Sequence, residues 1–147
     1  MAPPVATDAS GKPSTARAAA FFALFAIAPG LLYQYVQDHG RVLGADAQGL
    51  ARLALDVAPN ALGALAASSA IFIMAVGIAR NAPPVRTALV SAAIGVSGLL
   101  AWEIAQIAIP AATFDLQDIA WTLVGGVAFL LAAVGVFRSP AKKETRR

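Results

Sequence analysis

Four long apolar runs, separated by short polar segments, dominate the pattern of this chain. They cover about residues 16–36, 59–80, 87–109 and 116–137. An α-helix rises about 1.5 Å per residue, so a run of about 20 residues matches the roughly 30 Å hydrocarbon core of a bilayer. The pattern therefore predicts an all-α membrane protein whose membrane domain, residues 15–138, is a bundle of four transmembrane helices.

The segments around these runs are more polar. Residues 1–14 are rich in Pro, Ala, Ser and Thr and predict a flexible N-terminal tail, and residues 139–147 predict a charged C-terminal tail. Residues 37–55 form the most polar internal segment, and the apolar residues there and just beyond recur at helical spacing. This pattern indicates a short helix that lies on the membrane surface and leads into the second span.

The first apolar run has two interpretations. Its basic start is also found in signal peptides, but the run is longer than a usual signal core. We favour a retained helix, and we expect Pro29-Gly30 to kink it. The other runs carry faces of small residues that let helix backbones approach closely in a bilayer. Those around Gly95 and Gly125 would also permit a homo-oligomer.

The composition supports a membrane location and excludes several classes of function. Hydrophobic residues make up 59% of the 147 residues and charged residues only 13%, whereas soluble domains are nearer half apolar and a quarter charged. The absence of Cys excludes disulfides and thiolate chemistry, and the single His excludes a multi-His metal site. No cofactor or metal is expected. The basic residues flank apolar runs, so they indicate membrane topology and not a nucleic-acid partner.

The distribution of Lys and Arg predicts the orientation of the helices. With four spans, both tails and the 80–86 connection share one side, which holds Lys12, Arg17, Arg80, Arg86, Arg138, Lys142, Lys143, Arg146 and Arg147. The other side holds only Arg41 and Arg52. Because cytoplasmic segments carry the excess of basic residues, both termini are predicted to be cytoplasmic. The expected location is a bacterial-type cytoplasmic (inner) membrane, with the lipid bilayer as partner.

A dense polar stretch, residues 102–126, joins the third and fourth runs and contains no Lys or Arg. Carboxylates so close to lipid are costly and need a reason. Glu103 and Gln106 fall in the last turns of the third span, where three-residue spacing puts them on one face. Asp118 falls in the first turn of the fourth span, where the helix dipole favours an acid.

The second span enters the membrane from the same side as the fourth. Asp56 and Asn60 lie four residues apart at its entry, and Thr122 continues the stripe of Asp118 in the fourth span. Three helices are therefore expected to bring carboxylates and amides to one outward-facing level. The candidate ligand-binding residues are Glu103, Gln106, Asp118, Asp56, Asn60 and Thr122.

Several neighbouring residues have simpler interpretations. Asp115 is interpreted as a helix cap, and Asp56 has a second interpretation as the surface partner of Arg52. The remaining residues are interpreted as interfacial or solvated: Trp102, Trp121, Arg41, Arg52 and His39. Glu103 differs, because it lies inside a helix with no basic residue within four positions. It needs either a partner from another helix or a proton.

The third and fourth spans resemble the C-terminal half of the VanZ-like family of small membrane proteins. The resemblance rests on Glu103-x-x-Gln106, a turn at Pro110, and Asp118-x-x-x-Thr122-x-x-Gly125. The family typically has Glu-x-x-Gln, a loop Arg, and Asp-x-x-x-Asn-x-x-Gly.

The first half of the family often carries an Asp-Lys-x-x-His-like element, and Asp56-Val-Ala-Pro-Asn60 holds a comparable place here. Ala112 or a neighbour stands where the family has its loop Arg, and Thr122 stands for its Asn. Val57 and Asn60 stand for the Lys and His. The resemblance implies a small integral membrane protein from a family linked to resistance against teicoplanin-type antibiotics.

The favoured hypothesis is a VanZ-like protein with an outward-facing acidic pocket. The pocket would bind a polar or cationic group at the cell envelope, such as a lipid headgroup, a cell-wall precursor or an antibiotic. Three alternatives stay open: a membrane enzyme acting on a lipid-linked substrate with two carboxylates as acid and base, a small proton-coupled carrier, or a docking subunit of a membrane complex. No nucleophile or metal-ligand spacing identifies an enzyme, so no catalytic residue is named.

Overall fold

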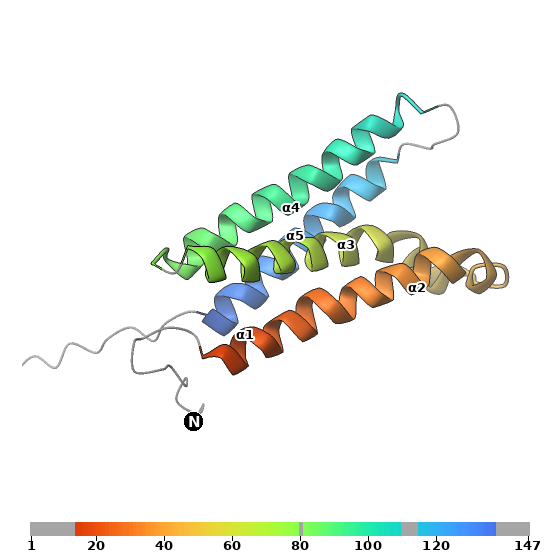
Figure 1. The fold of residues 1–147 in the computed structure, drawn as a ribbon. Coiled ribbons are helices and arrows are strands. Elements are labelled where there is room, and N and C mark those ends of the chain that lie inside the picture. The colour runs from red at the N-terminus through yellow and green to blue at the C-terminus, as the bar shows by residue number, and fades with distance from the viewer. Residues whose placement is uncertain (1–13, 80, 110–114, 138–147) are drawn as a thin grey trace, which may run out of the picture.

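The computed structural model describes residues 14–79, 81–109 and 115–137, and all regular structure within them is helical (Figure 1). Four helices are long and apolar enough to cross a membrane: Thr15–Gly40, Gly49–Ile78, Pro84–Gln106 and Leu116–Phe137. The predicted all-α bundle with four candidate membrane spans is therefore confirmed. The predicted tails, apart from Ser14, and the predicted turn at Pro110 lie outside the described residues.

The first candidate span is a composite helix. It consists of α1 (Thr15–Phe22), a π-helical turn η1 (Ala23–Ile27) and α2 (Ala28–Leu43). Pro29 has no backbone N–H, and in a regular α-helix its ring would clash with the carbonyl four residues earlier. The wider π turn accommodates the proline, and the Ala28 N–H donates to the Ala23 carbonyl five residues back. The irregularity expected at Pro29-Gly30 thus takes the form of a π turn just before the proline.

The second span is the single helix α3 (Gly49–Ile78), which is 30 residues long. The predicted surface helix over residues 37–55 is not a separate element. Its first part belongs to α2, its last part belongs to α3, and only residues 44–48 form the turn between them. Gly49 begins α3 with a φ of 56°, in the left-handed region that favours glycine. The polar segment is therefore a tight turn between two helices that extend beyond their apolar cores.

The last two spans are α4 (Pro84–Gln106) and α5 (Leu116–Phe137). Pro84 occupies the first turn of α4, where a missing N–H costs nothing. The Pro83 carbonyl accepts from the Thr87 N–H at 3.0 Å, so the preceding proline anchors this turn. The predicted fourth run, 116–137, coincides with α5, whereas α4 ends three residues before the predicted limit of 109.

Helix α3 is the centre of the bundle, because α2, α4 and α5 all pack against it. Small residues allow this packing. A Cβ at Gly125 in α5 would overlap the backbone carbonyl of Ala61 in α3, and a Cβ at Gly95 in α4 would lie 3.0 Å from the Ser68 nitrogen. Two helices therefore touch α3 backbone to backbone, as small residues permit in membranes.

Four phenylalanines hold one end of the bundle together. Phe21 from α1, Phe72 from α3, and Phe129 and Phe137 from α5 are buried, and their ring centroids lie between 5.1 and 6.4 Å apart in the five contacting pairs. The pairs are edge-to-face, which is a favourable arrangement for aromatic rings. The cluster fixes the first helix to the bundle at this end.

At the other end, the first helix separates from α4. Helix α2 packs against α3, whereas α2 and α4 make at most marginal contact. Figure 1 shows the α2–α3 pair (orange to yellow) and the α4–α5 pair (teal to blue) diverging away from the start of α1. The outer faces of all four spans carry exposed apolar side chains, among them Leu24, Leu31, Met74, Ile94, Val127 and Leu131. In a bilayer these side chains would contact lipid.

Candidate functional site

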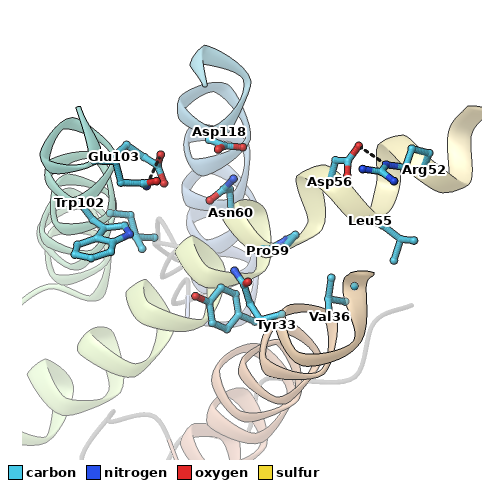
Figure 2. A pocket seen from close by; sticks show the side chains of 14 residues that line it. Tyr33, Val36, Arg52, Leu55, Asp56, Pro59, Asn60, Trp102, Glu103 and Asp118 are labelled. Carbon is cyan, nitrogen blue, oxygen red and sulfur yellow. Dashed lines mark hydrogen bonds and ion pairs between the residues drawn. The ribbon is translucent and has the colours of Figure 1, made fainter. Parts of the chain in front are cut away.

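A pocket of about 660 Å³ lies at the diverging end of the bundle, where α2 and α4 approach their C-termini and α3 and α5 begin (Figure 2). The antiparallel order of neighbouring helices brings these four ends together. The lining residues come from all four spans: Tyr33, Val36, Gln37 and Gly40; Arg52, Leu55, Asp56, Pro59 and Asn60; Leu99, Trp102, Glu103 and Gln106; and Asp118. Five of the six predicted site residues are among them.

Glu103 is the buried carboxylate of this pocket. Glu103 is only 5% exposed, although it lies in the last turn of α4. Gln106 donates from Nε2 to Oε2 of Glu103 at 2.9 Å, across the three-residue spacing expected from the sequence. Glu103 therefore neither faces lipid nor caps a backbone group, and its carboxylate is directed into the pocket (Figure 2).

Asp118 faces the pocket from the first turn of α5, and the amide of Asn60 in α3 points toward its carboxylate (Figure 2). Asp118 and Glu103 are close enough for their charges to interact. Asp115, one turn earlier, accepts the Gln117 N–H on Oδ1 at 2.8 Å. This bond has the geometry of a helix cap, as the sequence predicted for Asp115.

Arg52 and Asp56 form an ion pair on the α3 wall of the pocket, with Nε and Oδ2 3.0 Å apart. Their side chains are 56% and 52% exposed, and Nη1 of Arg52 also donates to the Gly44 carbonyl at 3.3 Å. Asp56 therefore pairs with Arg52, as one interpretation predicted, and it also lines the pocket. Arg52 itself was interpreted as an interfacial anchor and as the surface partner of Asp56, and not as a pocket residue. Its four-residue spacing from Asp56 was the signal that could have placed it in the site.

Thr122 is the predicted site residue that does not line the pocket. It lies one turn deeper than Asp118 in α5 and is only 1% exposed. Its hydroxyl has no hydrogen-bond partner among the described residues. The stripe expected from Asp118 to Thr122 is real in α5, but the packing of α3 covers its lower part, where Gly125 meets Ala61.

The sequence interpretation missed the contribution of α2. Tyr33, Gln37 and Gly40 line the pocket from one face of this helix, because they are separated by three to seven residues. Trp102, interpreted as a belt aromatic, lines the pocket while remaining 59% exposed. His39, expected in a solvated loop, is instead an exposed helical residue whose ring stacks on Tyr35 at 4.5 Å.

The lining of the pocket has more acidic than basic side chains. Three carboxylates and one guanidinium line it, together with the amides of Gln37, Asn60 and Gln106. The lining contains no Ser, Thr, Cys, His or Lys that could act as a nucleophile or base. In the part of the chain that the structure describes, no group of three acids or histidines is placed to hold a metal ion.

Comparison of the chain with family models, with curated proteins and with solved structures finds no match. What the pocket could bind is therefore inferred from its lining residues alone. The feature that most limits the choice of ligand is the buried carboxylate of Glu103, because a buried charge requires compensation.

Proposed function

We propose that the chain is a small VanZ-like membrane protein whose pocket binds the cationic group of a molecule at the membrane surface. The observation that carries this proposal is Glu103. Its carboxylate is buried within a pocket that it shares with two further carboxylates, and an amide is its only hydrogen-bond partner among the described residues. Asp56 is paired with Arg52, whereas Glu103 and Asp118 have no ion-pair partner among the described residues and repel each other unless a cation or protons reduce their charge.

The pocket residues divide into two roles. Glu103 and Asp118 supply negative charge for the bound cation, and Asp56 adds to it from the opposite wall. Gln106 and Asn60 orient the two central carboxylates from their positions beside them. Amide groups suit this task because they donate to a carboxylate without cancelling its charge.

The pocket faces the outer side of a bacterial-type cytoplasmic membrane. The turn at residues 44–48, which adjoins the pocket, falls on the side that holds only two of the basic residues, Arg41 and Arg52. The excess of Lys and Arg on the side of the two tails supports cytoplasmic termini. The ligand is then a molecule of the cell envelope, such as a lipid headgroup, a cell-wall precursor or an antibiotic.

Arg52 bears on the VanZ-like interpretation because this sequence lacks the loop Arg of the family motif. The family's loop Arg has no counterpart near Ala112, but Arg52 supplies a guanidinium to the pocket wall from α3. The pocket therefore combines acids and a cation, as the family motif does. The position of the cation in the sequence therefore differs from that in the family motif.

A fluorescence titration tests the proposed function. The chain has two tryptophans, so Trp121→Phe leaves Trp102, which lines the pocket, as the reporter. The purified protein in nanodiscs is titrated with octylamine, whose primary ammonium is the probe. We expect a saturable change in Trp102 emission. Glu103→Gln and Asp118→Asn should each raise the Kd for octylamine about tenfold, because each removes one negative charge that would contact the bound cation.

Asp46→Asn is the matched control, because Asp46 is exposed in the turn and does not line the pocket. It should titrate like the parent protein. Octylamine binding that is unaffected by both pocket variants would disprove the assignment of the cation site to this pocket.

A further inference from the structure

The pocket lies between α2 and α4 at the diverging end of the bundle. Its side walls are α2 and α4, which make at most marginal contact with each other. Three residues beyond Asn60 in α3, a Cβ at Gly63 would lie 3.6 Å from the Tyr33 ring of α2 and 3.9 Å from Leu99 of α4, so both helices reach the same face of α3. Because these helices are candidate membrane spans, an opening between α2 and α4 at this level would face lipid.

The lining is amphipathic. The apolar side chains of Val36, Leu99 and Trp102 lie on the two side walls, and Trp102 is largely exposed. The buried carboxylate of Glu103 lies beside Trp102 on the same helix, directed inward (Figure 2). A ligand that fills the pocket would therefore meet both apolar side chains and a buried carboxylate.

The polar part of the pocket has two charged poles. Arg52 lies on the α3 wall, whereas Glu103 lies across the pocket on α4, with Asp118 and Asn60 between them (Figure 2). A guanidinium has five N–H donors, and among the described residues Arg52 uses one on Asp56 and one on Gly44. The remaining donors can bind an oxyanion, to which a guanidinium is well suited.

We propose that the pocket is a laterally open site for a phospholipid whose headgroup carries a primary amine. The ammonium lies against Glu103 and Asp118, the phosphate lies against Arg52, and the acyl chains leave between α2 and α4. A primary ammonium fits better than a quaternary one because carboxylates accept its three N–H donors, whereas a quaternary group needs an aromatic cage. The inference rests on the proposed function, since it adds a phosphate and acyl chains to the cation already assigned there.

Four probes separate the parts of this ligand, with Trp102 emission of the Trp121→Phe protein as the readout. Dihexanoylphosphatidylethanolamine carries amine, phosphate and chains, and dihexanoylphosphatidylglycerol lacks the amine. Octylamine lacks the phosphate, and O-phosphoethanolamine lacks the chains. We expect the first probe to bind about tenfold more tightly than each of the others, because each of the others lacks one of the three contacts.

Variants assign each contact to a pole of the pocket. Arg52→Gln should weaken the binding of phosphatidylethanolamine about tenfold and should not weaken the binding of octylamine. Glu103→Gln should weaken the binding of phosphatidylethanolamine and of octylamine and leave the binding of phosphatidylglycerol unchanged. The double variant Arg52→Gln/Asp56→Asn keeps the net charge of the pocket, so weakened phosphatidylethanolamine in this protein too would assign the loss to the guanidinium and not to excess negative charge.

The two proposals fail in different ways. If octylamine binds and depends on Glu103 but neither Arg52 variant weakens phosphatidylethanolamine, the phospholipid inference is overturned and the proposed function stands. If O-phosphoethanolamine binds as tightly as the lipid, the lateral entry of acyl chains is overturned. If neither phosphatidylethanolamine nor octylamine binds the parent protein, both proposals are overturned.

Discussion

Gln106 donates to the buried carboxylate of Glu103 at 2.9 Å, from one turn further along α4. This bond compensates part of the cost of burying Glu103, and among the described residues it is the one hydrogen bond that the carboxylate makes. The stability of the pocket and the direction of its central acid therefore depend on the same side chain.

Replacing Gln106 should destabilise the protein through Glu103. Gln106→Leu keeps the approximate size but removes the donor, so we expect a loss of about 1–3 kcal/mol in the free energy of unfolding. The double variant Glu103→Leu/Gln106→Leu should recover much of this loss, because no buried charge is then left without a partner. Unfolding by SDS in mixed micelles measures both values. A single variant as stable as the parent protein would contradict the assigned bond.

The contact between Gly125 and Ala61 should tolerate no added methyl group. Gly125→Ala forces a Cβ onto the α3 backbone, and such overpacking costs about 1–3 kcal/mol. Gly135→Ala is the matched control on the same helix, because a Cβ there has no neighbour within 4 Å. The control should be unchanged or slightly stabilised, since Ala is the better helix former. Equal unfolding curves for the two variants would contradict backbone contact between α3 and α5.

The ion pair between Arg52 and Asp56 should contribute little to stability. Both side chains are about half exposed, and exposed pairs contribute about 0–1 kcal/mol. We therefore expect Arg52→Gln, Asp56→Asn and the double variant to unfold within about 1 kcal/mol of the parent protein in SDS titrations. A larger loss would mean that Arg52 holds the turn at Gly44 and would make its binding variants unsuitable.

The proposed orientation can be tested with single cysteines, because the chain has none of its own. Ala45 in the turn before α3 and Ala82 in the turn before α4 are both exposed. With cytoplasmic termini, a membrane-impermeant maleimide should label Ala45→Cys in intact cells. Ala82→Cys should react only after the cells are permeabilised. The reverse pattern would place the pocket on the cytoplasmic side.

The sequence was sufficient to predict those parts of the fold that depend on apolar length. The fourth run coincides with α5, since it has a clear polar start and no charged residue after Asp118. The start of α3 was misplaced by ten residues, because polarity there was interpreted as a surface helix and α3 continues through it. Hydropathy marks where a helix meets lipid and does not mark where the helix ends.

The candidate site was predictable to the extent that helix direction determined it. Glu103, Gln106 and Asp118 were found because antiparallel spans bring those helix ends to one level. Tyr33 and Gln37 were missed because the side on which α2 packs against α3 depends on contacts that no local pattern encodes. Thr122 was included because its register matched Asp118, but it is buried and does not line the pocket.

The length of α3 has a consequence for how the protein sits in a bilayer. Thirty residues extend about 45 Å, whereas the hydrocarbon core is about 30 Å thick. Tilt can absorb part of this mismatch, and the polar first turns of α3 must reach the headgroup layer. Arg52 would then lie at the depth of the lipid phosphates, and Asn60, about 12 Å further along the helix axis, would lie nearer the hydrocarbon. Bilayer thickness is thus a variable that should alter ligand affinity without any change in sequence.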